Sequence, residues 1–545
     1  MSLPIPLTIK LATARGTRDV TREARDLVMR WTDPGGYASC QVGLDRPLSL
    51  MPDEVAYYGA LTVHDARNAS TVWDGRLEDP GRSASADGQV WSLAALGGQA
   101  HTRDRIVPLI YVDRQLQGAW DRVVGSNPGV EGSVGTDPGD LSMSTPPALV
   151  LRYPEGVLLA TNDYGVMRYT RLHDAALKAA RVDYTWDAGA ASADTRLQLA
   201  VFTVDGLGEF PRDDAWSTAG GGSVPKVVVT NWTNARDIVD IRIKYTGAGG
   251  RFTNSAWWAT VRDLVVVAMR YTADGAEKTT GYTTNTVLAS EVVADLLGRV
   301  LTKFDGAGAT VFTTSHPIEQ MAYPDGADAN KVLTDLLALE AGHTWRVWER
   351  DSLGKYRFEF RPIETQVRYE ADVTDGYDSQ GSADGLYNAV TVRWRDPAGK
   401  VQTTTVTSTV PILTNADLTR TGQIDLGDEV GSAADASRAG EEWLAQRQYP
   451  PNAGRLRIAR PIWDIEDGRM VMPWEIRPGL IRVRGILPSV DALNATARDG
   501  VTIFRIATCE YRVSDGAATL ELDSRPRTVP VMLAQAAGRP VWRRR

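Results

Sequence analysis

The chain has 545 residues, of which 43% are hydrophobic and 23% are charged. This length is too great for one hydrophobic core, so we expect several domains, and the ordinary composition excludes a largely disordered protein. The formal net charge of -8 argues against a protein that grips the phosphates of DNA or RNA, because such proteins carry an excess of lysine and arginine.

The first region, 1–107, contains short stretches in which apolar and polar residues alternate between turn residues. These stretches predict strands at 57–64, 70–74 and 90–96. Within the same region, apolar residues recur at a spacing of three or four over 19–31, and this spacing predicts a helix.

Residues 108–147 are interpreted as a connection, because 126–147 are rich in Gly, Ser, Pro and Asp and offer no apolar residues for a core. A separate β region is expected over 148–272. Its predicted strands are 158–161, 179–186, 196–203, 226–230, 237–244 and 257–270. Short strands at this spacing are typical of a β-sandwich or jelly roll.

The pattern changes in a third region, 285–370. Apolar residues gather on one face of 287–300 and again on one face of 329–340, which predicts two helices. Gly342 is the expected C-terminal stop of the second helix. The strands predicted after it are 343–349 and 356–361. Two helices beside a hairpin indicate a small α+β domain.

The last region, 371–523, returns to a β pattern. A turn at 396–399 between two apolar stretches predicts a hairpin, and the apolar spacing over 433–447 predicts a helix. The predicted strands are 389–394, 401–406, 455–460, 481–486, 502–513 and 518–522. Residues 524–545 are expected to form a C-terminal tail.

No motif for a catalytic or metal site stands out. The histidines are His64, His101, His173, His316 and His343. None of them has the HExxH or HxH spacing of zinc ligands. Cys40 and Cys509 lie far apart without a nearby histidine, so they are interpreted as reduced thiols rather than as a disulfide, a zinc site or a nucleophile. We therefore expect no enzymatic activity, no cofactor and no metal.

The beginning of the chain does not resemble a signal peptide. Its first ten residues contain two prolines and lead into an arginine-rich stretch. Elsewhere no apolar run approaches the roughly 20 residues of a membrane helix. The sequence therefore predicts a soluble protein that is not exported by a classical signal.

Four tryptophans in the region 148–272 are candidate sugar-binding residues. They are Trp216, Trp232, Trp257 and Trp258. Aromatic rings stack on the faces of sugars, but tryptophans also fill the cores of β-sandwiches. Trp257 and Trp258 are neighbours on one predicted strand and would point to opposite faces, so we expect one in the core and the other more exposed. Sugar binding and packing both remain open interpretations.

Several short stretches share their order and spacing with a known family. They are VWDGRLEDPGR (72–82), QVWSLAALG (89–97), ALEAGHTWRVW (338–348), YNAVTVRW (387–394) and WEIRPGLIRV (474–483). In these stretches the chain resembles the minor tail proteins of actinobacterial siphophages, specifically the tail hub family, and the resemblance covers most of the chain. The region 148–272 departs from a minimal hub and resembles a carbohydrate-binding jelly roll inserted between hub elements.

The resemblance implies a mainly β, multidomain fold. Two β-barrels similar to tail-tube subunits are implied at 1–107 and 371–523, with the α+β region between or below them. Three chains would then form a homotrimeric hub of the virion's tail tip, made in the host cytoplasm. Six barrels would surround a channel through which DNA passes without specific binding. The implied partners are the distal tail protein, the tape measure protein, other tail-tip proteins and, through the jelly roll, a host cell-surface glycan.

Three alternative functions remain. The chain could be a subunit of the six-fold distal tail ring, which would need one barrel per chain. It could be a free-standing sugar-binding adhesin, in which case the hub-like flanks would be idle. A tail-associated cell-wall hydrolase is the third alternative, and it would require an active-site constellation that the sequence does not display.

Overall fold

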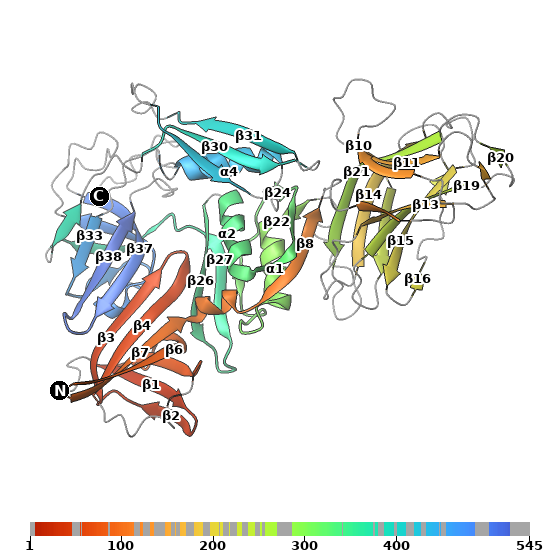
Figure 1. Cartoon of the computed structure of the whole chain (residues 1–545). Helices are drawn as coiled ribbons and strands as arrows, with labels where there is room; N and C mark the ends of the chain where they lie inside the picture. Colours follow the sequence, from red (N-terminus) through yellow and green to blue (C-terminus); the bar gives the residue numbers. More distant parts are fainter. Residues whose placement is uncertain are drawn as a thin grey trace.

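The computed structural model is shown in Figure 1. It describes residues 6–45, 55, 57–85, 88–113, 286–340, 342–373, 376–379, 386–396, 400–409, 419–426, 432–445, 447, 454–484 and 501–523, together with the backbone of strands β9 to β21 between 120 and 269. The fold is mainly β and multidomain, as predicted. None of the described helices combines the length and the apolar character needed to span a bilayer.

The N-terminal region forms an antiparallel sheet followed by a short 3-10 helix, η2. Its elements are β1 (Leu7–Thr13), β2 (Gly16–Asp19), β3 (Ala24–Thr32), β4 (Gly35–Asp45), β5 (Ala60–Asp65), β6 (Thr71–Ser85), β7 (Gly88–Gly97) and η2 (Gly98–Arg103). The strands pair in the order β2–β1–β5–β6–β7–β4–β3. Alternate residues such as Leu7, Ile9 and Leu11 are buried, so one face of the sheet carries the core.

The helix predicted over 19–31 is wrong, because this segment forms the end of β2, a turn and most of β3. Along β3 the buried residues Leu27, Met29 and Trp31 alternate with less buried ones, which is the period of a strand. A β-bulge near the start of β3 shifts the register by one residue. That shift produced the spacing of three that looked helical in the sequence.

The α+β region contains the two predicted helices, which are confirmed. Its elements are β8 (Ile106–Asp113), β22 (Val287–Leu288), α1 (Ala289–Arg299), β23 (Thr310–Val311), β24 (Pro317–Ile318), β25 (Met321–Asp328), α2 (Ala329–Leu339), β26 (His343–Arg350) and β27 (Tyr356–Pro362). The Asp328 carboxylate caps α2 by accepting a hydrogen bond from the backbone N–H of Lys331. Gly342 follows α2 with a φ of +84°, a conformation that favours glycine. Both helices pack their apolar faces against one face of the β26–β27 hairpin.

The C-terminal region forms a second sheet whose first and last strands, in pairing order, are consecutive along the chain. Its elements are β28 (Val367–Asp372), β29 (Tyr377–Ser379), β33 (Gly454–Ile458), β34 (Ile462–Asp464), β35 (Arg469–Val471), the 3-10 helix η3 (Pro473–Glu475), β36 (Leu480–Arg484), β37 (Val501–Arg512) and β38 (Ala517–Asp523). The strands pair in the order β28–β36–β37–β38–β33–β29, and β29 directly follows β28 along the chain.

A small separate unit is inserted into this C-terminal region. It consists of β30 (Ala389–Arg395), β31 (Val401–Thr407), β32 (Thr421–Asp425) and α4 (Ala433–Ala445). The predicted hairpin and helix are both present, but their strands form a three-stranded sheet of their own. Val390, Val392 and Leu444 belong to a core cluster distinct from the larger ones. The range 371–523 therefore holds two structural units rather than one barrel.

The N-terminal and C-terminal sheets are joined rather than separate. β3 pairs antiparallel with β37, and β4 pairs in parallel with β26 of the α+β region, so all three belong to one 18-stranded curled sheet. One hydrophobic cluster contains Trp31 and Trp73 from the first sheet together with Leu456 and Tyr511 from the second. In Figure 1 these regions lie side by side, with the N-terminal strands in red and the C-terminal strands in blue.

The region predicted as a jelly roll, 148–272, belongs to a larger body with two main antiparallel sheets and a two-stranded one, at the right of Figure 1. Its strands are β9 (Trp120–Val123), β10 (Glu131–Gly135), β11 (Ala148–Tyr153), β12 (Leu158–Leu159), β13 (Tyr164–Tyr169), β14 (Ala179–Ala188), β15 (Leu197–Asp205), β16 (Gly208–Phe210), β17 (Ser217–Thr218), β18 (Lys226–Asn231), β19 (Ile238–Tyr245), β20 (Arg251–Phe252) and β21 (Trp257–Met269). One sheet has the order β10–β11–β21–β14–β18, and the other has the order β16–β15–β19–β13–β9.

The range 108–147, interpreted above as a connection and linker, contributes strands to this body. β9 pairs with β13, and β10 pairs with β11. β8 pairs with both β21 and β25, so it links this body to the α+β region. The glycine-rich sequence of β10 forms a strand because a neighbouring strand supplies its hydrogen-bond partners. The predicted tail, 524–545, lies outside the described residues.

Candidate functional site

A pocket of about 320 Å³ lies where the N-terminal sheet, the α+β region and the C-terminal sheet meet. We call it the junction pocket. Its walls come from the start of β6, from β26, β27 and β28, and from the segment that runs from β34 to just beyond η3. The arginines that line it are Arg346, Arg357, Arg361, Arg368, Arg469 and Arg477, and the acidic residues are Glu359, Asp464, Asp467 and Glu475. Among its lining residues, cations therefore outnumber anions.

The β26–β27 hairpin presents one wall of the pocket through strand alternation. Trp345 and Phe360 face each other across the hairpin and belong to the core beneath α1 and α2. The next pair along the hairpin, Arg346 and Glu359, points to the opposite face and lines the pocket. Arg357 and Arg361 lie two residues on either side of Glu359, so they share its face.

A buried carboxylate behind this wall holds the three regions together. Asp33, at the end of β3, accepts hydrogen bonds from the guanidinium Nη2 atoms of Arg346 at 2.9 Å and of Arg505 at 2.6 Å. The side chain of Asp33 is fully buried, and those of the two arginines are 3% and 5% exposed. Thr344 donates a further hydrogen bond to Asp33. The residues come from the N-terminal sheet, from β26 and from β37, so one carboxylate connects all three regions.

The pKa of Asp33 reflects this arrangement. Burial alone would raise the pKa of this carboxyl. The positive charges of Arg346 and Arg505, together with the hydrogen bonds from Arg346 and Thr344, outweigh burial and hold the pKa of Asp33 well below its ordinary value. The folded structure therefore favours the ionised form of Asp33.

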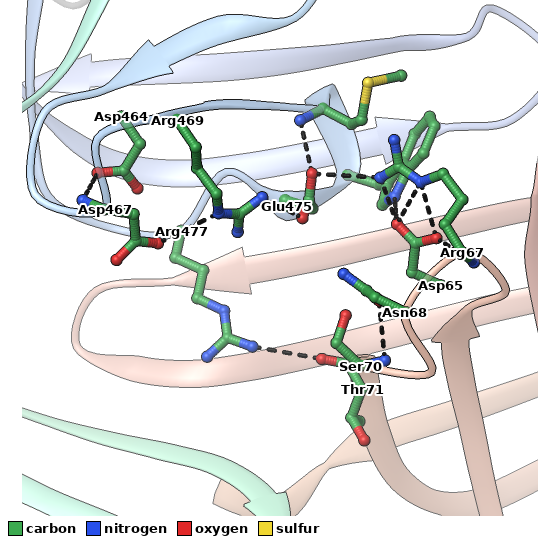
Figure 2. Close-up of polar contacts among 12 residues, drawn as sticks. Asp65, Arg67, Asn68, Ser70, Thr71, Asp464, Asp467, Arg469, Glu475 and Arg477 are labelled. Carbon is green, nitrogen blue, oxygen red and sulfur yellow. Dashed lines mark hydrogen bonds and ion pairs between the residues drawn. The ribbon is translucent and has the colours of Figure 1, made fainter.

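The opposite wall is organised around Asp65, at the end of β5 (Figure 2). Its carboxylate accepts hydrogen bonds from Nε of Arg67 at 2.9 Å and from the indole N–H of Trp474 at 3.0 Å. The Arg67 guanidinium also lies over the Trp474 ring, 5.2 Å from its centre. Glu475 joins the cluster through Nη2 of Arg67, at 3.4 Å, and also pairs with Arg469 at 2.9 Å. These contacts attach the β5–β6 turn of the N-terminal sheet to η3 of the C-terminal sheet.

Arg477 forms the back of the pocket. Figure 2 shows its guanidinium directed at Thr71, and its Nη2 donates to the Thr71 carbonyl at 3.3 Å and to the Tyr37 hydroxyl at 3.0 Å. The same guanidinium lies over the ring of Trp348, 4.8 Å from its centre. The nearest carboxylate is that of Glu349, at 3.6 Å. A cation is thus held in place mainly by neutral groups.

The sugar-binding tryptophans predicted from the sequence do not belong to the junction pocket. Trp216 and Trp232 lie outside the described residues. Trp257 and Trp258 begin β21, opposite Tyr153 and Arg152 of β11, and only their backbone is described. Sugar binding at these residues stays a prediction.

The described histidines have separate side-chain partners. His64 contacts Thr62, His101 contacts Asp104, and His316 contacts Asp435. His343 lies 4.0 Å from Glu340, which also accepts a hydrogen bond from the backbone N–H of His316, while His173 is outside the described residues. Among the described residues, no group of three or more His, Cys, Asp and Glu side chains is placed to hold a metal ion.

Sequence reasoning missed the junction pocket. One signal for it was present, because Arg357, Glu359 and Arg361 alternate with aromatic residues along one predicted strand. That alternation indicates a charged face opposite an aromatic one. Apart from β26 and Arg368 of β28, the remaining walls come from segments more than 100 residues away on either side, and no local pattern could have placed them there.

Comparisons with known proteins gave structural neighbours only. No protein-family model matches the chain, and no curated protein matches it. The chain is similar to a tail protein from Neisseria meningitidis MC58, with a TM-score of 0.43, 8% identity and coverage of 96% of this chain and 98% of that chain. It is also similar to the 43 kDa tail protein of prophage MuSo2 from Shewanella oneidensis, with a TM-score of 0.42, 9% identity and coverage of 96% and 98%. Prophage tail protein gp18 from Listeria monocytogenes EGD-e has a TM-score of 0.40, 8% identity and coverage of 97% and 98%.

A further neighbour matches only part of the chain. It is the CBM22-1 xylan-binding domain of Paenibacillus barcinonensis Xyn10C, with a TM-score of 0.21, 13% identity and coverage of 30% of this chain and 96% of that domain. At these identities and TM-scores the likenesses do not decide a function, so the proposals below depend on the residues of this chain.

Proposed function

We propose that this chain is a non-enzymatic structural subunit of a bacteriophage tail, and that three copies form the hub at the tail tip. The observation that carries the proposal is the β3–β37 ladder, which joins the N-terminal and C-terminal sheets edge to edge within one chain. A hub of the proposed kind needs two β units per chain at a fixed orientation. Three chains would then contribute six units, enough to match a six-fold tube.

The contacts at the junction support a fixed orientation. The two sheets share one hydrophobic cluster, and Asp33 and Asp65 each bind residues of the C-terminal region at hydrogen-bond distance. Buried ionic contacts tolerate little change in geometry, because an uncompensated buried charge is costly. A chain built in this way would present both sheets to its neighbours at one angle.

The charge balance also suits a conduit. The chain has 68 acidic and 60 basic residues, so acidic surface is available to line a channel. Repulsion between such a surface and DNA would let DNA pass without specific binding. The proposed partners are further copies of the chain, the distal tail protein, the tape measure protein and other tail-tip proteins, and the proposed location is the virion.

The β body between 120 and 269 is the proposed attachment module. Two antiparallel sheets on a separate body, joined to the rest through β8, suit a module that reaches a host cell-surface glycan. This role is a second, independent part of the proposal. The hub could assemble whether or not the module binds a sugar.

Oligomer mass and symmetry test the hub proposal directly. Native mass spectrometry of the purified chain, of 59.4 kDa, is expected to show a trimer, and low-resolution images of native tail tips should show three copies around one axis. Six copies per tip would indicate a distal tail ring instead. A monomer at micromolar concentration, absent from the tail tip, would contradict the tail role altogether.

A cell-wall assay separates the structural role from a hydrolase. The purified protein is expected to release neither reducing sugar nor peptide from host cell wall. Robust turnover that is abolished by substituting a single Asp, Glu or His would contradict the non-enzymatic part of the proposal and leave the oligomer result unaffected.

A further inference from the structure

We propose that the junction pocket binds a phosphate ester, with Arg357 and Arg361 holding the phosphate and Arg477 behind them. The site does not depend on the hub proposal, because it is formed within one chain. Its ligand class follows from the charges, the hydrogen bonds and the apolar groups that line the pocket.

Three of the pocket arginines are already matched by carboxylates. Arg346 is bound by Asp33 and Glu364. Arg368 pairs with Asp464 at 3.1 Å. A further pair joins Arg469 and Glu475 at 2.9 Å. These three arginines therefore hold the walls of the pocket in place through their ion pairs.

The other three pocket arginines, Arg357, Arg361 and Arg477, have only longer contacts with carboxylates. Arg357 lies 3.3 Å from Glu349, which it shares with Arg477, and 3.9 Å from Glu359. The Nε atom of Arg361 is 4.0 Å from Glu364, and among the described residues this buried nitrogen has no hydrogen-bond acceptor. A buried N–H donor without an acceptor is costly, so a ligand oxygen at this position would relieve a real deficit.

Geometry favours a tetrahedral oxyanion between two of these side chains. Arg357 and Arg361 are four residues apart on one face of β27, so their backbones are about 13 Å apart at roughly 3.3 Å per residue. Glu359 stands between them on the same face, 3.9 Å from Arg357, so the phosphate would be held by the outer ends of the two arginine side chains, beyond this carboxylate. Guanidinium groups bind phosphate with paired N–H donors, and a phosphate offers three oxygens to them. A single carboxylate has only two oxygens and would leave donors of the third arginine unmatched.

The size and the apolar lining favour an ester rather than the free ion. The pocket volume of about 320 Å³ exceeds that of a phosphate and leaves space for an attached polyol or sugar. Trp348, Val471 and Trp474 supply apolar surface beside the arginines. The hydroxyl-bearing residues Ser70 and Thr71 line the pocket at the start of β6 and can contact such a group.

Titration calorimetry of the full-length chain with glycerol 3-phosphate tests this proposal. Saturable binding is expected, weaker binding is expected for inorganic phosphate, and none is expected for glycerol. Arg361→Gln and Arg357→Gln should each weaken the binding of glycerol 3-phosphate about tenfold or more, because each removes one charge-assisted pair. Arg361→Lys should fall between the wild type and Arg361→Gln, since it keeps the charge but loses the paired donors.

Arg393→Gln is the matched control. Arg393 lies on β30, has a side chain that is 47% exposed against 46% for Arg357, and pairs with one carboxylate at 3.7 Å. This variant should bind glycerol 3-phosphate like the wild type, and the melting temperature of every variant should lie close to that of the wild type. Equal weakening by the control would show that the effect is one of general charge and would overturn the site.

Two further experiments distinguish which kind of molecule supplies the phosphate group. A short duplex DNA that competes with glycerol 3-phosphate, and whose binding is weakened by Arg361→Gln, would identify the nucleic-acid backbone as the source. Failure of DNA to compete would identify a small phosphate ester or a phosphate-bearing surface polymer. Tighter binding of glutarate than of glycerol 3-phosphate, or no saturable binding of either phosphate at millimolar concentration, would overturn the proposal.

Discussion

Replacement of Asp33 by asparagine should destabilise the joined sheets strongly. The substitution removes the negative charge between two guanidinium groups that are 3% and 5% exposed. Arg346 retains Glu364 as a partner, but among the described residues Asp33 is the only carboxylate paired with Arg505. Removing one partner of a buried ion pair costs about 3–5 kcal/mol. At about 2–4 °C per kcal/mol for a unit of 150–250 residues, the melting temperature should fall by roughly 6–20 °C.

Asp435→Asn is the informative comparison. Asp435 is also fully buried, yet its replacement by asparagine should not lower the melting temperature. One of its oxygens binds Nε2 of His316 at 3.0 Å, while the buried Oδ2 has no hydrogen bond in the described structure. Burial raises the pKa of Asp435, and the hydrogen bond from His316 only partly offsets it. Ionisation of this carboxyl at neutral pH therefore opposes folding. The asparagine variant should melt at the same temperature as the wild type or higher.

The effect of Asp33→Asn should depend on pH in a defined direction. Because the folded-state pKa of Asp33 is lowered, its stabilising contribution is fully present above the ordinary carboxyl value of about 3.9 and is lost as the pH falls through the folded-state value. Circular dichroism melts at pH 7, 5 and 3 measure this. The difference between wild type and variant should be equal at pH 7 and 5 and smaller at pH 3. A melting temperature for Asp33→Asn within 2 °C of the wild type at pH 7 would refute the reasoning.

Three further predictions follow from burial and strand pairing. Gly36→Ala should lower the melting temperature measured by differential scanning calorimetry, because Gly36 has a φ of +79° and an added Cβ would lie 2.3 Å from a backbone oxygen of β26. An unchanged melting temperature would contradict the contact between β4 and β26. Cys40 and Cys509 should not react with Ellman's reagent until the protein unfolds, because both are buried and burial raises the pKa of each thiol. Rapid labelling of the native chain would argue against the core positions of these residues on β4 and β37. A fragment of 120–272 should melt cooperatively and at a higher temperature than a fragment of 148–272, because only the longer fragment contains β9 and β10. Equal melting temperatures would mean that these two strands do not stabilise the body.

Local patterns predicted those elements whose residues carry their own signal. The helices α1 and α2 follow from apolar residues on one face, and Gly342 indeed adopts the left-handed conformation that ends the second. The strands β26 and β27 follow from their aromatic alternation. In each of these elements the partner face is supplied by a neighbour close in sequence, so the local pattern and the tertiary contacts agree.

Long-range pairing decided the features that the sequence did not reveal. Trp31 pairs with Cys509, more than 470 residues away, and nothing near either residue indicates the ladder between β3 and β37. The sequence of β10, Glu131–Gly135, has a composition typical of a loop and forms a strand only because β11 lies beside it. The junction pocket is hidden for the same reason, since its walls come together only after these ladders have formed.

The three regions of the junction are connected by ion pairs in which one region supplies the carboxylate and another supplies the arginine. The N-terminal sheet supplies buried carboxylates, Asp33 and Asp74, and the other regions supply the arginines that bind them, Arg505 from β37 and Arg350 from β26. Apolar contacts alone would allow the sheets to slide, because hydrophobic burial has no direction. Paired hydrogen bonds between a guanidinium and a carboxylate allow only one angle. In the proposed ring of six β units, an angular error at each junction would accumulate until the ring failed to close. A buried ionic junction within each chain would remove that error at half of the contacts in the ring, and only the contacts between chains would remain to be set by assembly.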